Sequence, residues 1–147
     1  MKQTIQLSKN NLFYSICGIW IIGLIFRLFY FDETIPLSMD ALSFFTYSAD
    51  ITSIGKLPET YDITKPGWSY LLAVVFSVFN FEYTMQYMQL QKIISVILSS
   101  LITIPVYFLC KKYFNKKIAL VGVALIAFDP RLILNSVLGI TEPIFIL

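Results

Sequence analysis

Histidine is absent from the chain, and charged residues are scarce. Without histidine the chain has no histidine general base and no histidine-ligated metal centre. Charged residues make up 14% of the sequence, whereas soluble domains contain about a quarter. Hydrophobic residues make up 57%, and the mean hydropathy is +0.74. The composition therefore predicts an integral membrane protein whose principal surroundings are the lipid bilayer.

Cysteine and basic clusters are also sparse. The two cysteines, Cys17 and Cys110, lie far apart in apolar segments, which predicts buried thiols and no disulfide framework. The formal net charge is +2, and no basic run has the density of a nucleic-acid-binding surface. Nucleic acid is therefore not expected as a partner.

The apolar residues gather in long stretches. They occupy residues 12–31, 68–81, 87–110 and 118–147, the last interrupted by DPR at 129–131 and TEP at 141–143. A membrane-spanning helix needs about 20 residues, so the first and third stretches are long enough. The second is shorter, in the range typical of interfacial or re-entrant helices.

The distribution of charge predicts an orientation. The segment KKYFNKK at 111–117 and the N-terminal tail carry lysines and no acid, so the positive-inside rule places both in the cytoplasm. Two points on one side require an even number of crossings between them. Residues 68–81 are therefore expected on the outer surface, within one large external loop over 32–85. The acids of that loop outnumber its two lysines, Lys56 and Lys65; they are Asp32, Glu33, Asp40, Asp50, Glu59, Asp62 and Glu82.

The resulting prediction is an all-α, polytopic membrane protein with a cytoplasmic N-terminus, multi-pass in the plasma membrane. Its expected segments are transmembrane helices at 11–31, 86–110 and 113–131, external helices at about 38–54 and 67–80, a cytoplasmic loop at 111–117 and an external loop at 131–142. Ser38 is the expected N-cap of the first external helix, and Gly55 its end. A further transmembrane helix is expected to begin at 143–147. Because that helix has only begun, we expect the chain to be the N-terminal part of a longer protein.

Three ionisable groups are expected at the outer face: Asp40, Arg131 and Glu142. A carboxylate can take a proton from an attacking hydroxyl, and a guanidinium can bind a departing phosphate bidentately. Carboxylates can also hold a divalent cation. Structural interpretations stand beside these. Asp40 and Glu142 can stabilise helix starts, and Asp129 can pair with Arg131 to close a helix.

Arg27 lies deep in the first apolar stretch. A charged side chain in such a segment is costly, and it either reaches toward the membrane surface or finds a partner. We expect Arg27 to extend toward the outer surface or to pair with an acid such as Asp32.

The order of segments resembles a known superfamily. It runs from MDA near the start of the external loop through KPGWSYLLAVVFSVF and LQKIISVILSSLITIPVYFLCKKYF to IALVGVALIAFDPRLILNSVLGITEP. This order resembles the N-terminal module of the GT-C glycosyltransferases, and among them it is most similar to archaeal members. That superfamily includes oligosaccharyltransferase catalytic subunits, protein O-mannosyltransferases and aminoarabinose transferases. The resemblance covers nearly the whole chain and implies a GT-C-like module whose large first external loop contains amphipathic helices.

The resemblance implies an activity and a site. The activity is transfer of a sugar from a polyprenyl-phosphate or polyprenyl-diphosphate donor to a protein or lipid/glycan acceptor at the outer face. Asp40 of SMDAL matches the family's essential aspartate, and Glu142 of GITEP matches an acid of the second external loop. Arg131 lies where some members place a basic residue near the donor phosphate. In a metal-dependent enzyme, Asp40 and Glu142 would bind Mg²⁺ or Mn²⁺.

The oligosaccharyltransferase branch has two acids where this chain has only Glu142, which weakens the match to a metal-dependent site.

Two other interpretations remain open from the sequence. The chain is alternatively a non-enzymatic membrane component, such as a lipid-linked-sugar flippase or a transporter. It is also interpretable as an inactive, truncated relative.

Overall fold

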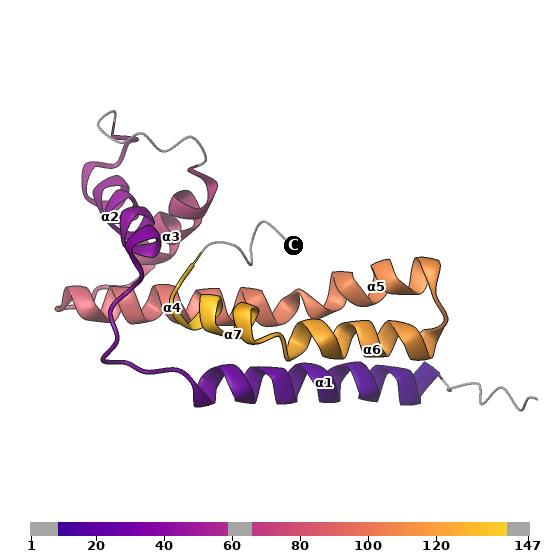
Figure 1. Ribbon diagram of the computed structural model, residues 1–147. Coiled ribbons are helices and arrows are strands. Elements are labelled where there is room, and N and C mark those ends of the chain that lie inside the picture. The colour runs from indigo at the N-terminus through magenta and orange to yellow at the C-terminus, as the bar shows by residue number, and fades with distance from the viewer. Residues whose placement is uncertain (1–8, 59–65, 141–147) are drawn as a thin grey trace, which may run out of the picture.

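The computed structural model describes residues 9–58 and 66–140. Within these two ranges the chain folds into seven α-helices joined by turns, without any strand (Figure 1). The helices are α1 (Lys9–Phe29), α2 (Met39–Ile54), α3 (Gly67–Val78), α4 (Thr84–Leu101), α5 (Thr103–Tyr113), α6 (Lys116–Ala127) and α7 (Pro130–Val137). The all-α prediction is confirmed for this part of the chain.

Helix α1, the continuous rod α4–α5, and α6 followed by α7 form a bundle (Figure 1). At one end of it Leu12 packs against Tyr107, Ala119 and Val123. The starts of α1 and α6 therefore lie together, and both helices run opposite to α4–α5. This end of the bundle contains the α5–α6 turn, and the opposite end carries α2 and α3.

Two helices are long and apolar enough to cross a membrane: Asn11–Phe29 and Thr84–Tyr113. A third candidate span is the pair α6–α7, which is bent by 44° at its break. At 1.5 Å per residue, the 30 residues of Thr84–Tyr113 extend for about 45 Å, against about 30 Å of hydrocarbon. A helix of this length is about ten residues longer than a span of the hydrocarbon core requires. Figure 1 shows α4 projecting past the last turn of α1.

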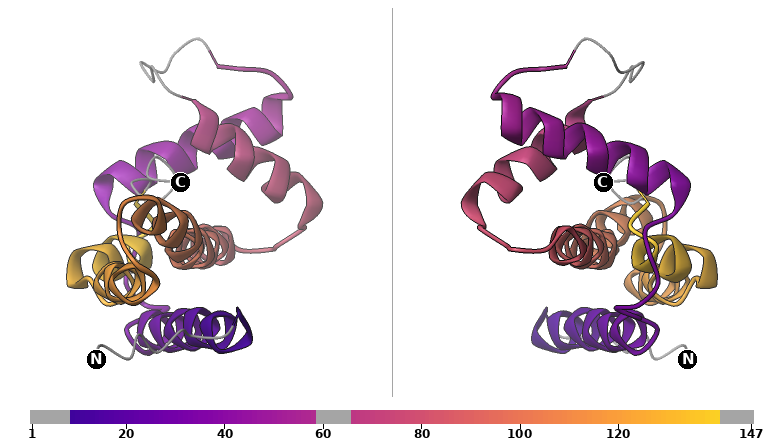
Figure 2. Two further views of the ribbon diagram at one scale, coloured as in Figure 1. Left: turned by 90° about the vertical axis from the view of Figure 1, so that its right-hand side faces the viewer. Right: turned by 90° about the vertical axis from the view of Figure 1, so that its left-hand side faces the viewer.

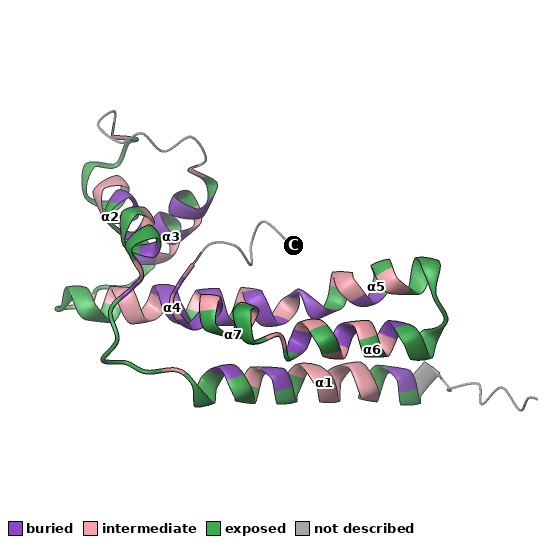
Figure 3. Ribbon diagram, viewed as in Figure 1, coloured by how far each residue is buried: buried purple, intermediate pink, exposed green. Residues whose placement is uncertain are grey.

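Helix α1 lies at the edge of the bundle. Exposed and half-buried positions occur along its length (Figure 3). The exposed large apolar side chains include Phe13, Ile21 and Phe29. In water such a surface would be unfavourable, whereas lipid tails are as apolar as these side chains. The exposure pattern therefore agrees with a helix that faces lipid.

Helices α2 and α3 pack on one another and run across the bundle instead of along it (Figure 2). Their shared core is apolar and consists of Leu37, Ala41, Phe45, Trp68, Leu72 and Phe76. The predicted cap and stop of α2 are confirmed. The Ser38 hydroxyl accepts a hydrogen bond from the Ala41 amide, and Gly55 ends the helix in the left-handed conformation with φ +73°.

The first half of the expected external loop over 131–142 is helical, because residues 130–137 form α7; its place outside the membrane stays a prediction. The expected ion pair between Asp129 and Arg131 is wrong too. Asp129 Oδ1 instead accepts hydrogen bonds from the backbone amides of Arg131 (2.8 Å) and Leu132 (3.2 Å). An aspartate N-cap followed by proline at the first helical position is a signal that starts a helix.

The expected loop over 111–117 is shorter than predicted. Helix α5 continues to Tyr113 and α6 begins at Lys116, so only Phe114 and Asn115 connect them. Asn115 Oδ1 caps α6 by accepting from the Ile118 amide at 3.0 Å. The start of a further transmembrane helix at 143–147 lies outside the described residues.

A matched pair of glycine substitutions measures how tightly α7 packs on the entry to α2. Gly139 and Gly55 share positive φ angles of 75° and 73°. A Cβ on Gly139 would lie 2.6 Å from Leu37 Cδ2, whereas a Cβ on Gly55 would meet nothing within 4 Å. Both alanine variants carry the same backbone cost of about 1 kcal/mol. We expect Gly139→Ala to lower the free energy of unfolding in detergent by about 1–3 kcal/mol more than Gly55→Ala. Equal losses would contradict this packing.

Candidate functional site

Asp40 lies in the first turn of α2 and is exposed. Two contacts place this turn. The Ser38 hydroxyl caps the helix, and the Ser38 amide donates to the Leu138 carbonyl at 3.4 Å. Within the described ranges no hydrogen bond or ion pair engages the Asp40 carboxylate. The start of α2 is thus docked on the end of α7, with its carboxylate accessible.

Arg131 is the second residue of α7 and is also exposed. Its backbone amide is bound by Asp129, while its guanidinium has no partner in the part of the chain that the structure describes. Leu138, the residue that contacts Ser38, lies seven positions after Arg131, which corresponds to a rise of about 10 Å along the helix. The structure does not bring Asp40 and Arg131 into contact but places them near the two ends of α7. Glu142 lies outside the described residues.

An apolar groove of about 540 Å³ runs between α7 and the end of α1. Its lining consists of Phe26, Tyr30, Ile35, Phe128, Pro130, Ile133, Leu134, Val137 and Leu138. Residues three and seven positions apart share a face of a helix, so Arg131 lies on the same face as Leu134 and Leu138. Arg131 itself is not among the lining residues, but it directly follows Pro130, which is.

The buried face of α4 is polar, which the sequence reasoning largely missed. Polar residues recur every four positions at Gln91, Ser95 and Ser99, and Thr103 at the start of α5 continues the pattern; each is at most 1% exposed. Gln91 Nε2 donates to the carbonyls of Ala41 (3.0 Å) and Gly139 (3.3 Å). Ser95 Oγ donates to the Ile140 carbonyl at 3.1 Å. The four-residue spacing within an apolar helix was the signal available for finding this face.

Lys92 anchors the connection between α1 and α2. It is 1% exposed, and its ammonium donates to the carbonyls of Asp32 (2.6 Å) and Ile35 (2.9 Å). The ammonium also lies 5.0 Å from the centroid of the Phe31 ring, within cation–π range. Since Lys92 is held by these backbone carbonyls, it fixes the path of the chain into α2.

Arg27 neither reaches toward the surface nor pairs with Asp32, so both expectations for it are wrong. It is 1% exposed and donates to the carbonyls of Ala127 (2.9 Å) and Gly23 (3.1 Å) and to Ser99 Oγ. Within a continuous helix the Ala127 carbonyl would accept from the Arg131 amide, but Asp129 has taken that amide. Arg27 therefore caps the end of α6 at the break and replaces the lost helical bond.

The Asp32 carboxylate is hydrogen-bonded within its own loop, to Thr34. The hydroxyl and the backbone amide of Thr34 donate to its Oδ1 at 2.7 and 2.8 Å. These two hydrogen bonds lower the pKa of Asp32 below its usual 3.8, and the charge of Lys92 lowers it slightly further. Because the folded pKa is depressed, the stabilisation is present at neutral pH and is lost as the pH falls through that lowered pKa.

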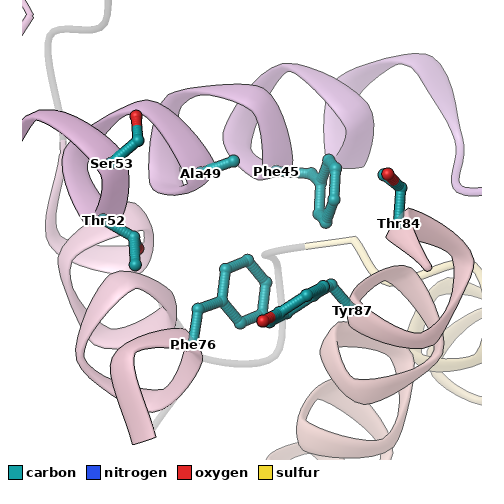
Figure 4. A pocket seen from close by; sticks show the side chains of 7 residues that line it. All are labelled: Phe45, Ala49, Thr52, Ser53, Phe76, Thr84 and Tyr87. Carbon is teal, nitrogen blue, oxygen red and sulfur yellow. The ribbon is translucent and has the colours of Figure 1, made fainter. Parts of the chain in front are cut away.

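A second pocket, of about 290 Å³, lies between α2, α3 and the start of α4 (Figure 4). It is lined by Phe45, Ala49, Thr52, Ser53, Phe76, Thr84 and Tyr87. The Tyr87 hydroxyl donates to the Phe79 carbonyl at 2.8 Å and accepts from the Phe81 amide at 3.1 Å. This hydroxyl therefore closes the α3–α4 turn, and Asp40 is not part of the pocket lining.

The described residues do not by themselves fit a metal centre. Across residues 9–58 and 66–140, no group of three or more histidine, cysteine, aspartate or glutamate side chains is arranged to hold an ion. Glu142, the expected co-ligand of Asp40, lies outside the described residues.

Comparisons with protein-family models, curated proteins and solved structures return no match to the chain. Conclusions about its function therefore depend on the residues and their geometry.

Proposed function

We propose that this protein is an integral membrane glycosyltransferase of the GT-C type. It would move a sugar from a polyprenyl-phosphate-linked donor to an acceptor at the outer face of the membrane. The observation that carries the proposal is a juxtaposition along α7. Exposed Arg131 follows Pro130, which lines an apolar groove, at one end of the helix, and the start of α2 with exposed Asp40 is docked at the other end.

The groove and Arg131 suit the two parts of a lipid phosphate. An isoprenoid chain is apolar and would bury its surface against the groove, while its phosphate would meet the guanidinium of Arg131. The groove lies beside the end of α1, a candidate span, so a lipid can approach it from the bilayer.

Asp40 is suited to activate the acceptor. Its carboxylate is exposed, and no described residue engages it. It can take a proton from an acceptor hydroxyl or orient an acceptor amide as the sugar is transferred. The rise of about 10 Å along α7 between Arg131 and the docked α2 leaves room for a sugar between phosphate and base.

The Arg131→Gln variant tests the proposal through the donor. Loss of a charge-assisted phosphate contact, worth about 1.5–3 kcal/mol, should raise the KM for the polyprenyl-phosphate sugar about tenfold or more. The measurement is sugar transfer from a radiolabelled donor in membranes that contain the whole protein. Lys56→Gln is the matched control, because it removes an exposed positive charge just beyond α2. A donor KM unchanged by Arg131→Gln would contradict the assignment of Arg131.

A transporter or lipid flippase is the second candidate, and the broken pair α6–α7 favours it. Discontinuous helices and buried polar residues are typical of transporter binding sites. However, the polar side chains of α4 mostly end on protein partners. Of this helix's buried polar side-chain atoms, only Gln91 Oε1 lacks a partner in the described part. Transbilayer movement of a fluorescent lipid phosphate in proteoliposomes, without sugar transfer, would support this candidate.

A further inference from the structure

The amide of Gln91 joins two segments that are distant in the sequence. Its Nε2 donates to Ala41 in the first turn of α2 and to Gly139 just after α7. Ala41 is the residue after Asp40, and Gly139 follows the helix that carries Arg131. We propose that Gln91 is a positioning residue, which holds the start of α2 on the end of α7 and so fixes Asp40 relative to Arg131. This inference rests on the proposed function.

The orientation of the amide is determined by its surroundings. Gln91 is fully buried, and a reversed amide would bring Oε1 against two carbonyl oxygens. The orientation that satisfies both carbonyls leaves Oε1 without a partner among the described residues. An unpaired buried acceptor destabilises a fold. The side chain thus makes two stabilising hydrogen bonds through Nε2 and leaves Oε1 unpaired, which is destabilising. Its net effect on global stability is therefore small.

Two other contacts lie at the same junction between α2 and α7. The close approach of Gly139 to Leu37 and the Ser38–Leu138 backbone bond bring the two segments together. Gln91 is the side chain that bonds to both of them within the described part of the chain. Arg131, in contrast, is held through α6 and the cap that Arg27 provides. Loss of the Gln91 amide should therefore disturb Asp40 and leave the donor phosphate site in place.

The first test measures position without activity. Spin labels are placed at the exposed residues Met39 and Leu134 by cysteine substitution, with Cys17 and Cys110 replaced by alanine. We expect one narrow distance between the labels in the parent protein and a broadened distribution in Gln91→Met, which keeps the length of the side chain but removes its donor. Gln89→Met is the matched control and should stay narrow. The melting temperature of Gln91→Met should change by no more than about 3 °C. A narrow, unshifted distance in Gln91→Met would overturn the proposal.

The second test separates positioning from general damage. In Gln91→Met, kcat for sugar transfer should fall about tenfold or more, because small displacements of a catalytic group are costly. The donor KM should stay within about twofold, since Arg131 is anchored elsewhere. An unchanged kcat with a broadened distance would overturn the positioning role. If the parent protein transfers no sugar at all, the proposed function fails, while the spin-label distance still decides whether Gln91 holds α2 on α7.

Discussion

Replacement of Asp40 by asparagine is expected to lower kcat for sugar transfer by about 10²–10⁴-fold, the range typical of losing a general base. Asparagine has the same shape as aspartate but cannot take a proton at neutral pH. The side chain is exposed and its carboxylate is not engaged by any described residue, so the variant should fold. The measurement is single-turnover sugar transfer by the whole protein in native membranes, with saturating donor.

The structural interpretation of Asp40 makes a different prediction. A carboxylate that only favours the start of α2 would contribute about 0.3–1 kcal/mol through the helix dipole. Asp40→Asn would then lower stability slightly and leave kcat unchanged. Glu82→Gln is the matched control, because Glu82 is an exposed acid that precedes α4 on the same side of the bundle. Unchanged transfer by Asp40→Asn would remove Asp40 from the chemistry.

The second large effect is expected at Arg27. Arg27→Met should lower the free energy of unfolding by about 2 kcal/mol, because it leaves the Ala127 carbonyl without its donor at the break. The loss is reduced because the variant no longer buries a guanidinium. Each orphaned buried group costs about 1–3 kcal/mol, and the variant orphans the Ala127 carbonyl and removes the donors to Ser99. The net effect therefore remains destabilising.

Two further variants show whether the cap is responsible. Arg27→Lys retains one donor that can reach a carbonyl, so it should lose less stability than Arg27→Met. Leu28→Ala changes the neighbouring residue, which is 54% exposed, and should have little effect. The measurement is unfolding in mixed micelles by titration with a denaturing detergent. Equal stability of Arg27→Met and the parent protein would show that the break in α6–α7 does not need this cap.

The helices and their ends were mostly predictable. Long apolar stretches predicted α1 and α4–α5, and the cap at Ser38 and the stop at Gly55 predicted α2. These signals are local, because a cap acts over three residues and a helix over a few turns. A capping pattern of the same local kind is present at Asp129 and Pro130. We interpreted it as the end of a helix, although an aspartate followed by proline marks a start.

The candidate site was only partly predictable. Asp40 and Arg131 were named from the sequence, and both are exposed and lie near the ends of one short helix. Their side chains are not in contact, and whether they act together stays a prediction. The backbone contacts that Gln91, Lys92 and Arg27 make nearby were not predicted. A polar residue in an apolar helix has many possible partners, and the sequence does not show which carbonyl lies beside it.

The sequence by itself determined an apolar helical chain, its candidate spans, its contrast of charge and the ends of α2, because composition, periodicity and capping act over short distances. Only the tertiary structure decided the partners of the buried polar side chains. Arg27 meets the Ala127 carbonyl from 100 residues away, and Gln91 meets the Ala41 carbonyl from 50. The reason is that a buried donor must find an acceptor that the fold brings beside it. The last carbonyls of a helix lack an intrahelical partner, as at Ala127 in α6, whereas Ala41 in the first turn of α2 is placed beside Gln91 by the packing of the helices.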